Sequence, residues 1–397
     1  MRKLDSRTGF VGFLRRQNLA LCGAFVVALS GLAAAALAGR ANDGPGPESR
    51  LAARSCPRPY SASSPWNVPI PRQAAVDRRS QTYVGNLGDR LSSDPTQYTY
   101  PVYEVGRSTT RESVLLSGLY SNVVRGGRGL VREQDARIAL PIPAAARAAA
   151  GSDASIVILD RSTGDEWGIW QLSGGSGGWR GRNGYHYNTR WSAVPPAGFG
   201  SRGAGVPYLA GLVRPCEIAR GRIDHALAFA YDFPTGDFVY PATKSDGKGA
   251  VGADVPEGAR LQLDPGLTAR ELQASGCRGA CLTIARALQR YGMYVIDNSG
   301  RPKIMLEYEG TARWNGAVSS RTVAPIRLSW FRALTLTCVV PPVNGRPVAV
   351  AQTLVRLAHC GTARVRRVRS AASRGRVVAQ RPAPGTRSGP VVLSVSR

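Results

Sequence analysis

The chain has 397 residues, and its 52 Lys plus Arg against 26 Asp plus Glu give a formal net charge of +26. Hydrophobic residues make up 43% and charged residues 20%, which excludes disorder of the whole chain. The excess positive charge indicates an anionic partner or surface, and at this point it leaves nucleic acid among the candidates.

The N-terminus has the pattern of an export signal. Residues 1–18 are rich in Arg and Lys, and residues 19–38 form an apolar run without a charge. The run ends in Ala36-Leu37-Ala38, which is typical of a cleavage site, but it is also long enough to span a bilayer as an anchor. Both outcomes stay open. Either one predicts an extracytoplasmic protein, secreted or anchored to the cytoplasmic membrane facing the wall, and argues against a nucleic-acid partner.

The rest of the chain divides into three predicted parts. Residues 39–59 form a spacer rich in Pro, Gly and Ser, residues 60–335 form a β-rich domain, and residues 336–397 form a small C-terminal domain. In the β-rich domain, Ser155–Asp160 and Glu166–Leu172 predict a hairpin around a Ser-Thr-Gly-Asp turn. A second hairpin is predicted from residues 223–231 and 237–240.

A helix is predicted from the capping pattern Thr268-x-x-Glu271 and from apolar residues at helical spacing up to Tyr291. Strands are then predicted at 293–297 and 303–309, separated by a turn. Many short strands with one embedded helix predict a mainly β fold, of β-sandwich or jelly-roll type, because the alternating helices of a parallel α/β sheet are missing.

The cysteines agree with export. Cys22 lies in the apolar run, and an even number remains beyond it, which indicates disulfides. The pairing of Cys56, Cys216, Cys277 and Cys281 is left open. No metal site is expected, because the chain has three His and none lies near the Cys277-x-x-x-Cys281 pair. No cofactor is expected either, since no phosphate-binding loop occurs.

Candidate catalytic residues are Glu166, His225 and Asp297. Glu166 shares a strand face with Trp170, and a carboxylate beside an indole suits a sugar site. Glu166 and Asp297, brought close, could act as acid and base in glycoside hydrolysis. The alternative for Glu166 is an exposed strand residue, and for Asp297 a cap of the following turn.

His225 lies on a bulky apolar strand face, which favours a buried structural histidine over a catalytic base. With the loop around Tyr185 and Arg190 it could instead belong to a polysaccharide lyase site. Candidate glycan-binding residues are Trp170, Trp179, Tyr185 and Arg190. The Gly-rich loop that carries Trp179 could also be only a mobile binding loop.

The C-terminal residues 338–397 resemble a PASTA domain. The resemblance rests on Val340-Pro341-x-Val343-x-Gly345, a helix from about Val348 to His359, Gly375-x-Val377-x-x-Gln380-x-Pro382-x-x-Gly385 and a closing Val392-x-x-Val395-Ser396. It implies one helix on a three-stranded sheet, a Cys338–Cys360 bridge and affinity for peptidoglycan fragments in the bacterial cell wall. A structural spacer is the alternative.

The domain at 60–335 resembles a group of secreted bacterial β-rich proteins of unestablished activity. Matching stretches include Ser64-Pro65-Trp66-Asn67, Gly205-x-Pro207-x-x-x-Gly211-Leu212-Val213-Arg214, Ile223-x-His225-Ala226-Leu227-x-Phe229 and Ala287-Leu288-x-x-Tyr291-Gly292-Met293. The resemblance implies one β-rich unit in which these segments meet, and no reaction.

The C-terminal domain also concentrates positive charge. It has Arg364, Arg366, Arg367 and Arg369 close together and no acidic residue, which indicates salt-sensitive affinity for an anionic wall polymer or lipid surface. The alternative is an Arg-rich composition in which Arg replaces Lys across the whole chain. The sequence therefore supports two functions. The first is an envelope protein that binds wall glycan, with a membrane contact if residues 19–38 are uncleaved. The second is a carbohydrate-active enzyme, a glycoside hydrolase or polysaccharide lyase, tethered to the wall. The oligomeric state is not predicted.

Overall fold

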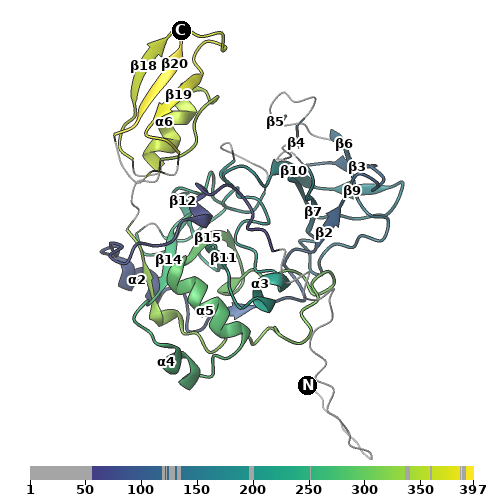
Figure 1. Ribbon diagram of the computed structural model, residues 1–397, viewed down its shortest axis with the longest axis vertical. Coiled ribbons are helices and arrows are strands. Elements are labelled where there is room, and N and C mark those ends of the chain that lie inside the picture. Colours follow the sequence, from purple (N-terminus) through teal and green to yellow (C-terminus); the bar gives the residue numbers. More distant parts are fainter. Residues whose placement is uncertain are drawn as a thin grey trace, which may run out of the picture. The chain divides into compact units, whose positions relative to one another are not determined.

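Short strands in several sheets make up most of the regular structure in this computed structural model, so the fold is mainly β as predicted (Figure 1). The structure describes residues 56–118, 121, 123–124, 130–131, 136–195, 201–250, 252–335, 340–357, 360–384, 386 and 390–397. All of them belong to the unit Pro47–Arg397. No helix in these ranges is long and apolar enough to cross a membrane, and the predicted export segment 19–38 lies outside them.

A six-stranded mixed sheet organises the first core. Its order is β1 (Ser92–Ser93), β16 (Lys303–Ile304), β11 (Leu227–Tyr231), β15 (Met293–Asn298), β14 (Arg260–Leu263) and β17 (Phe331–Ala333). The central strands β11 and β15 run parallel, and every residue of β11 is buried. Burial on both faces explains why β11 reads as a continuous apolar run rather than an alternating one.

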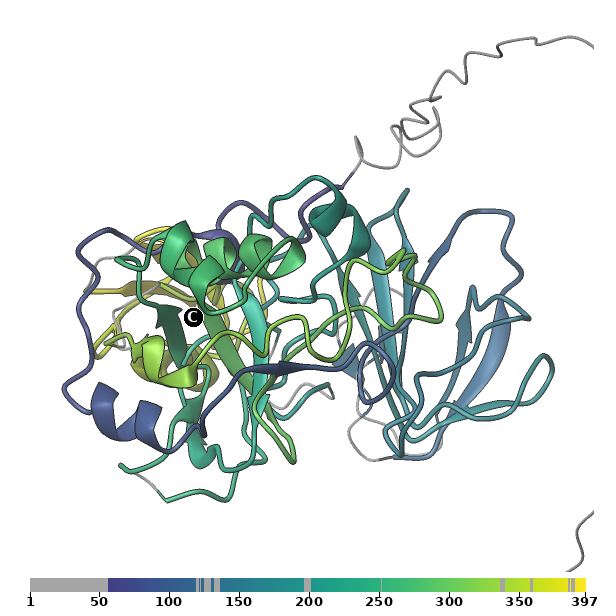
Figure 2. The same cartoon turned by 90° about the horizontal axis from the view of Figure 1, so that it is seen from below.

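Helices α4 (Ala269–Ala274) and α5 (Ala280–Arg290) cover one face of this sheet, and both are green in Figure 2. The predicted capping box is confirmed, because Thr268 and Glu271 cap α4 reciprocally. The predicted single helix is divided in two, with the Cys277–Cys281 disulfide at the division. Ile284 and Leu288 of α5 pack into the core below.

Two further sheets pack face to face as a β-sandwich. One has the order β10 (Asn183–Asn188), β8 (Asp165–Trp170), β7 (Ile156–Asp160), β2 (Val102–Val105), and the other β6 (Ala136–Leu140), β3 (Glu112–Leu116), β9 (Trp179–Gly181). Side chains from both sheets, including Leu116, Ile158 and Trp167, share one core. The predicted hairpin is confirmed, because β7 and β8 pair antiparallel.

The second predicted hairpin is corrected by the structure. Strand β11 pairs with β15 and β16, while β12 (Thr235–Phe238) pairs in parallel with β13 (Pro256–Glu257). The turn-like residues 233–236 therefore separate two sheets instead of closing one hairpin. The remaining elements are η1 (Pro65–Asn67), α2 (Ser80–Gly85), β4 (Val123–Val124), β5 (Leu130–Val131), α3 (Pro215–Ala219) and η2 (Leu328–Trp330).

The segments expected to meet in the β-rich domain do meet. The backbone N–H of Ala226 donates to the carbonyl of Trp66 at 2.7 Å, and the N–H of Ala228 donates to Gly211 at 2.9 Å. The rings of Trp66 and Tyr294 make an edge contact at 4.9 Å. Gly211 has φ +73°, and a Cβ there would lie 2.4 Å from the nitrogen of Ala228, so glycine is required at this crossing.

The C-terminal residues form a helix followed by a three-stranded sheet. Helix α6 (Val348–Leu357) precedes a sheet of order β18 (Arg364–Val368), β20 (Val392–Ser396), β19 (Val377–Arg381). Buried apolar residues of this segment, such as Leu354, Val377 and Leu393, gather in one core. The element order agrees with the prediction from sequence. Cys338 lies outside the described residues, so its predicted bridge to Cys360 stays a prediction.

Candidate functional site

A cavity of about 510 Å³ lies where the six-stranded sheet and the β7–β8 hairpin approach each other. The end of β15 supplies Asp297, the end of β8 supplies Trp170, and loops supply most of the other residues. Functional residues commonly lie on loops that a rigid scaffold positions. The lining residues are Tyr100, Asp153, Ser155, Trp170, Asn183, Ser201, Arg202, Gly203, Tyr208, Lys244, Asp246, Asp297, Asn298, Ser299 and Gly300.

Three carboxylates meet at this cavity. Asp246, Glu257 and Asp297 each have an oxygen within 4.8 Å of the other two. Asp246 is exposed, Asp297 is partly buried and Glu257 is completely buried. Burial, together with the charges of Asp297 and Asp246, raises the pKa of Glu257 to about 10, although Lys244 lowers it. Burial and the neighbouring Asp246 likewise raise the pKa of Asp297 to about 7, against Lys244 and Arg202.

Two basic side chains line the same cavity. The guanidinium of Arg202 is 3% exposed and donates to the Tyr100 hydroxyl at 3.2 Å and to the carbonyls of Ala210 and Tyr208. The ammonium of Lys244 donates to the carbonyls of Arg202 at 2.7 Å and Gly203 at 2.9 Å. Burial lowers the pKa of Lys244. These contacts fix the loop that carries Gly203 against the carboxylates.

Aromatic rings form the rest of the wall. Tyr100 and Tyr208 stack with their ring centroids 4.3 Å apart, and Arg202 lies over the Tyr100 ring at 4.8 Å. Trp170 is partly exposed, and its Nε1 donates to Asp153 at 3.2 Å. The cavity therefore combines an accessible indole with charged and hydroxyl groups, a composition suited to a polar ligand that has an apolar face.

Of the three predicted catalytic residues, Asp297 lines the cavity. Glu166 is completely buried and receives hydrogen bonds from the hydroxyls of Tyr60 at 2.6 Å and Tyr185 at 2.7 Å, and from the N–H of Leu209 at 3.1 Å. Burial raises its pKa although these bonds oppose the shift. The expected alternative of an exposed strand residue is wrong. Glu166 instead holds the Tyr208–Leu209 segment behind the cavity wall.

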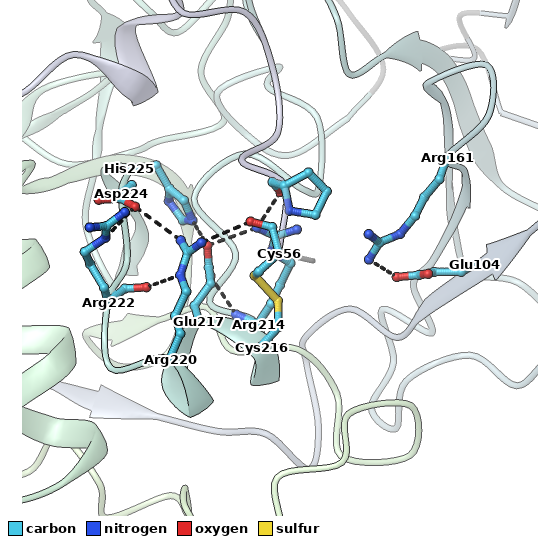
Figure 3. Close-up of a disulfide and its surroundings, with 11 residues drawn as sticks. Cys56, Glu104, Arg161, Arg214, Cys216, Glu217, Arg220, Arg222, Asp224 and His225 are labelled. Atoms are coloured by element: carbon cyan, nitrogen blue, oxygen red, sulfur yellow. Dashed lines mark hydrogen bonds and ion pairs between the residues drawn. A yellow bond between two sulfur atoms is a disulfide. The ribbon is translucent and has the colours of Figure 1, made fainter. Parts of the chain in front are cut away.

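His225 belongs to a different cluster, beside the Cys56–Cys216 disulfide (Figure 3). Its Nε2 lies 2.9 Å from Glu217, and its Nδ1 lies 2.9 Å from the carbonyl of Ala226. Glu217 also pairs with Arg214 at 3.0 Å. Burial favours the neutral form of Glu217, but Arg214 and His225 outweigh it and hold its pKa well below the usual range. Both ring nitrogens are engaged, which agrees with the structural interpretation of His225.

Of the predicted glycan-binding residues, some line the cavity and others do not. Trp170 lines the cavity. Trp179 is 3% exposed and Tyr185 is 1% exposed, so neither ring offers a face to a ligand, and the structure corrects both assignments. Arg190 is exposed and donates to the carbonyl of Ser162 at 3.1 Å, in the turn after β7.

In the C-terminal segment, Arg364, Arg366 and Arg367 are exposed on the strand β18, and Arg369 is exposed just after it. These side chains are accessible to a polymer. Arg202, Lys244, Asp246 and Glu257 were not identified as site residues from the sequence. They come from two loops and a two-residue strand, and no sequence pattern connects these three segments.

The comparisons with known proteins identify no relative. No protein-family model, no curated protein and no solved structure matches the chain. The Cys56–Cys216 and Cys277–Cys281 disulfides resolve the open pairing of these four cysteines and are consistent with an extracytoplasmic location.

Proposed function

We propose that the chain is an exported bacterial envelope protein that binds wall glycan in the cavity around Trp170. The observation that carries the proposal is the partly exposed indole of Trp170, fixed by its hydrogen bond to Asp153 at the rim of a polar cavity. An indole face packs on the apolar face of a sugar ring, while Asp153, Asn183 and Lys244 can bond its hydroxyl groups.

The C-terminal domain is the second proposed contact with the wall. Its helix and three-stranded sheet have the element order expected of a PASTA domain, which favours binding of peptidoglycan fragments. The exposed arginines of β18 add attraction to an anionic wall polymer. Two weak contacts on one chain strengthen each other, because the second one forms at a high effective concentration.

Calorimetric titration of the protein with soluble peptidoglycan fragments tests the cavity. Trp170→Ala is expected to weaken binding at least about fivefold, since stacking on one aromatic ring contributes on the order of 1 kcal/mol or more. Trp191→Ala is the matched control, because Trp191 is 49% exposed and does not line the cavity. Equal affinities for the two variants would refute the cavity as the glycan site.

A carbohydrate-active enzyme is the second candidate, and the carboxylates of Asp246 and Asp297 in one cavity favour it. Their separation of at most 4.8 Å is closer to the ~5–5.5 Å of retaining glycoside hydrolases than to the ~6.5–9.5 Å of inverting ones. The predicted pair of Glu166 and Asp297 lacks support, because Glu166 is enclosed by its three donors. Release of reducing ends from wall glycan, abolished in Asp246→Asn, would favour the enzyme.

A further inference from the structure

Glu257 is a buried carboxyl group beside the cavity lining. Its side chain is 0% exposed, and no donor group of a described residue reaches either oxygen; its side-chain hydrogen bond is to another carboxyl group, that of Asp246, and needs a shared proton. Burial of an ionised carboxylate without a donor or counter-charge is strongly unfavourable, so such a group needs a cation or a proton. Asp246 and Asp297 present their oxygens to the same point, within 4.8 Å. Three acidic groups therefore converge, and no donor group of a described residue reaches the most buried of them.

The space between these oxygens is kept open by Gly203. A Cβ atom on Gly203 would lie 2.4 Å from Oδ1 of Asp246 and 2.4 Å from Oε1 of Glu257. The φ angle of Gly203 is not in the left-handed region, so the backbone conformation does not require glycine here. Glycine is needed because any side chain would occupy the volume between the two carboxylates.

The neighbouring basic side chains, Lys244 and Arg202, donate their hydrogen bonds to groups other than the three carboxylates. Lys244 donates to the carbonyls of Arg202 and Gly203, and Arg202 donates to Tyr100 and to two further carbonyls. Both still lower the pKa of Asp297 through their charge. If the three carboxylates and Asp153 are all ionised, their negative charge exceeds the positive charge of Arg202, Lys244 and Lys303, and a bound divalent cation would favour this ionised form.

We propose that Asp246, Glu257 and Asp297 bind one Ca²⁺ ion at the floor of the cavity. Carboxylate oxygens are the ligands that hard cations prefer. Two oxygens on opposite sides of Ca²⁺ are about 4.6–5.2 Å apart, and about 4.0–4.2 Å apart around Mg²⁺, by the usual bond lengths. The three carboxylate oxygens all lie within 4.8 Å of one another, so the coordination shell of one Ca²⁺ ion can include them. Water or a ligand in the cavity completes the coordination, which needs six to eight oxygens.

This proposal is independent of glycan binding, and its test uses CaCl₂ alone. The protein is treated with EDTA, dialysed into chelator-free buffer and titrated by calorimetry. One site per chain is expected, with a dissociation constant of about 10⁻⁴–10⁻³ M or tighter, as in extracellular calcium modules. Mg²⁺ is expected to bind at least about tenfold more weakly. Glu257→Gln and Gly203→Ala are each expected to weaken Ca²⁺ binding at least about tenfold, the first by removing a ligand charge and the second by filling the site.

Asp89→Asn is the matched control, because the Asp89 side chain is 76% exposed and pairs only loosely with Arg90. It is expected to bind Ca²⁺ like the original protein. Thermal unfolding without Ca²⁺ checks that each variant is folded, and added CaCl₂ is expected to raise the unfolding temperature of the original protein and of Asp89→Asn alone. Absence of binding up to about 10 mM CaCl₂, or equal binding by Glu257→Gln, Gly203→Ala and the control, would overturn the proposal.

Discussion

The hydroxyl of Tyr185 donates to Glu166 at 2.7 Å and accepts the backbone N–H of Tyr208 at 2.6 Å. This single phenol therefore connects a completely buried carboxylate to the segment that lines the cavity. Tyr60 and the N–H of Leu209 complete the hydrogen bonding of Glu166. Glu166, a candidate catalytic residue from the sequence, therefore acts as a positioning residue for the Tyr208–Leu209 segment of the cavity wall.

Glu166→Gln is expected to destabilise the protein by about 1–3 kcal/mol, because the amide cannot accept all three hydrogen bonds and leaves a buried donor unsatisfied. The same variant is expected to weaken glycan binding, although Glu166 does not line the cavity. Urea unfolding gives the free energy, and calorimetry gives the affinity. A fully stable Glu166→Gln protein would contradict the positioning role.

Glu217→Gln is expected to be more damaging. It leaves the buried Arg214 without its negatively charged partner and weakens the contact to His225, at a cost of about 3–5 kcal/mol in the free energy of unfolding. The low pKa of Glu217 means that its stabilising effect is present above about pH 4.5 and is lost as the pH falls. The difference between the original protein and the variant should therefore shrink on acidification. Asp89→Asn, at an exposed pair, should change stability little.

Glu307 is expected to give the opposite pH dependence. It is 8% exposed and accepts a hydrogen bond from Thr311, and burial raises its pKa to about 7. Glu307 binds its proton more tightly in the folded protein than in the unfolded chain. Its contribution to the free energy of unfolding is therefore highest below about pH 4.5 and falls as the pH rises to 7. Glu307→Gln should remove this fall, and above pH 7 it should exceed the original protein by up to about 3 kcal/mol. A difference that is constant between pH 4.5 and 8 would refute the assignment.

Binding to isolated walls is expected to depend on salt through the C-terminal arginines. Arg364, Arg366 and Arg367 are exposed on β18. Their combined replacement by Gln should weaken binding and reduce its dependence on salt, because exposed charges are screened within about 8 Å at physiological ionic strength. Replacement of the exposed Arg72, Arg78 and Arg107 by Gln removes the same charge from elsewhere. Equal losses in the two triple variants, measured by sedimentation with walls, would show that net charge alone governs binding.

Local patterns in the sequence predicted where strands form better than they predicted which strands pair with each other. The alternation and turn around Ser162-Thr163-Gly164 predicted the β7–β8 hairpin, because a short turn leaves the two strands little choice. Strand β11 pairs instead with β15, more than 60 residues away, and such a parallel pairing has no local signal. The turn at Phe233–Gly236 therefore suggested a hairpin that does not form.

The candidate site could be predicted only in part for the same reason. Asp297 and Trp170 lie at ends of strands with clear patterns, and both line the cavity. Glu257 lies in a two-residue strand and Lys244 in a loop, and tertiary packing alone brings them beside Asp297. Trp179 and Tyr185 carry the same residue types as surface sugar sites, but their neighbours enclose them. Residue type alone does not distinguish these environments.

Fluorine NMR of protein labelled with 5-fluorotryptophan tests the central claim most directly. The resonances of Trp170 and Trp191 are assigned from Trp170→Phe and Trp191→Phe, and soluble peptidoglycan fragments are then titrated. The account predicts that the Trp170 resonance shifts and saturates with the glycan while the Trp191 resonance, from an exposed indole outside the cavity, stays in place. Glycan binding that leaves the Trp170 resonance unchanged would contradict the cavity as the binding site.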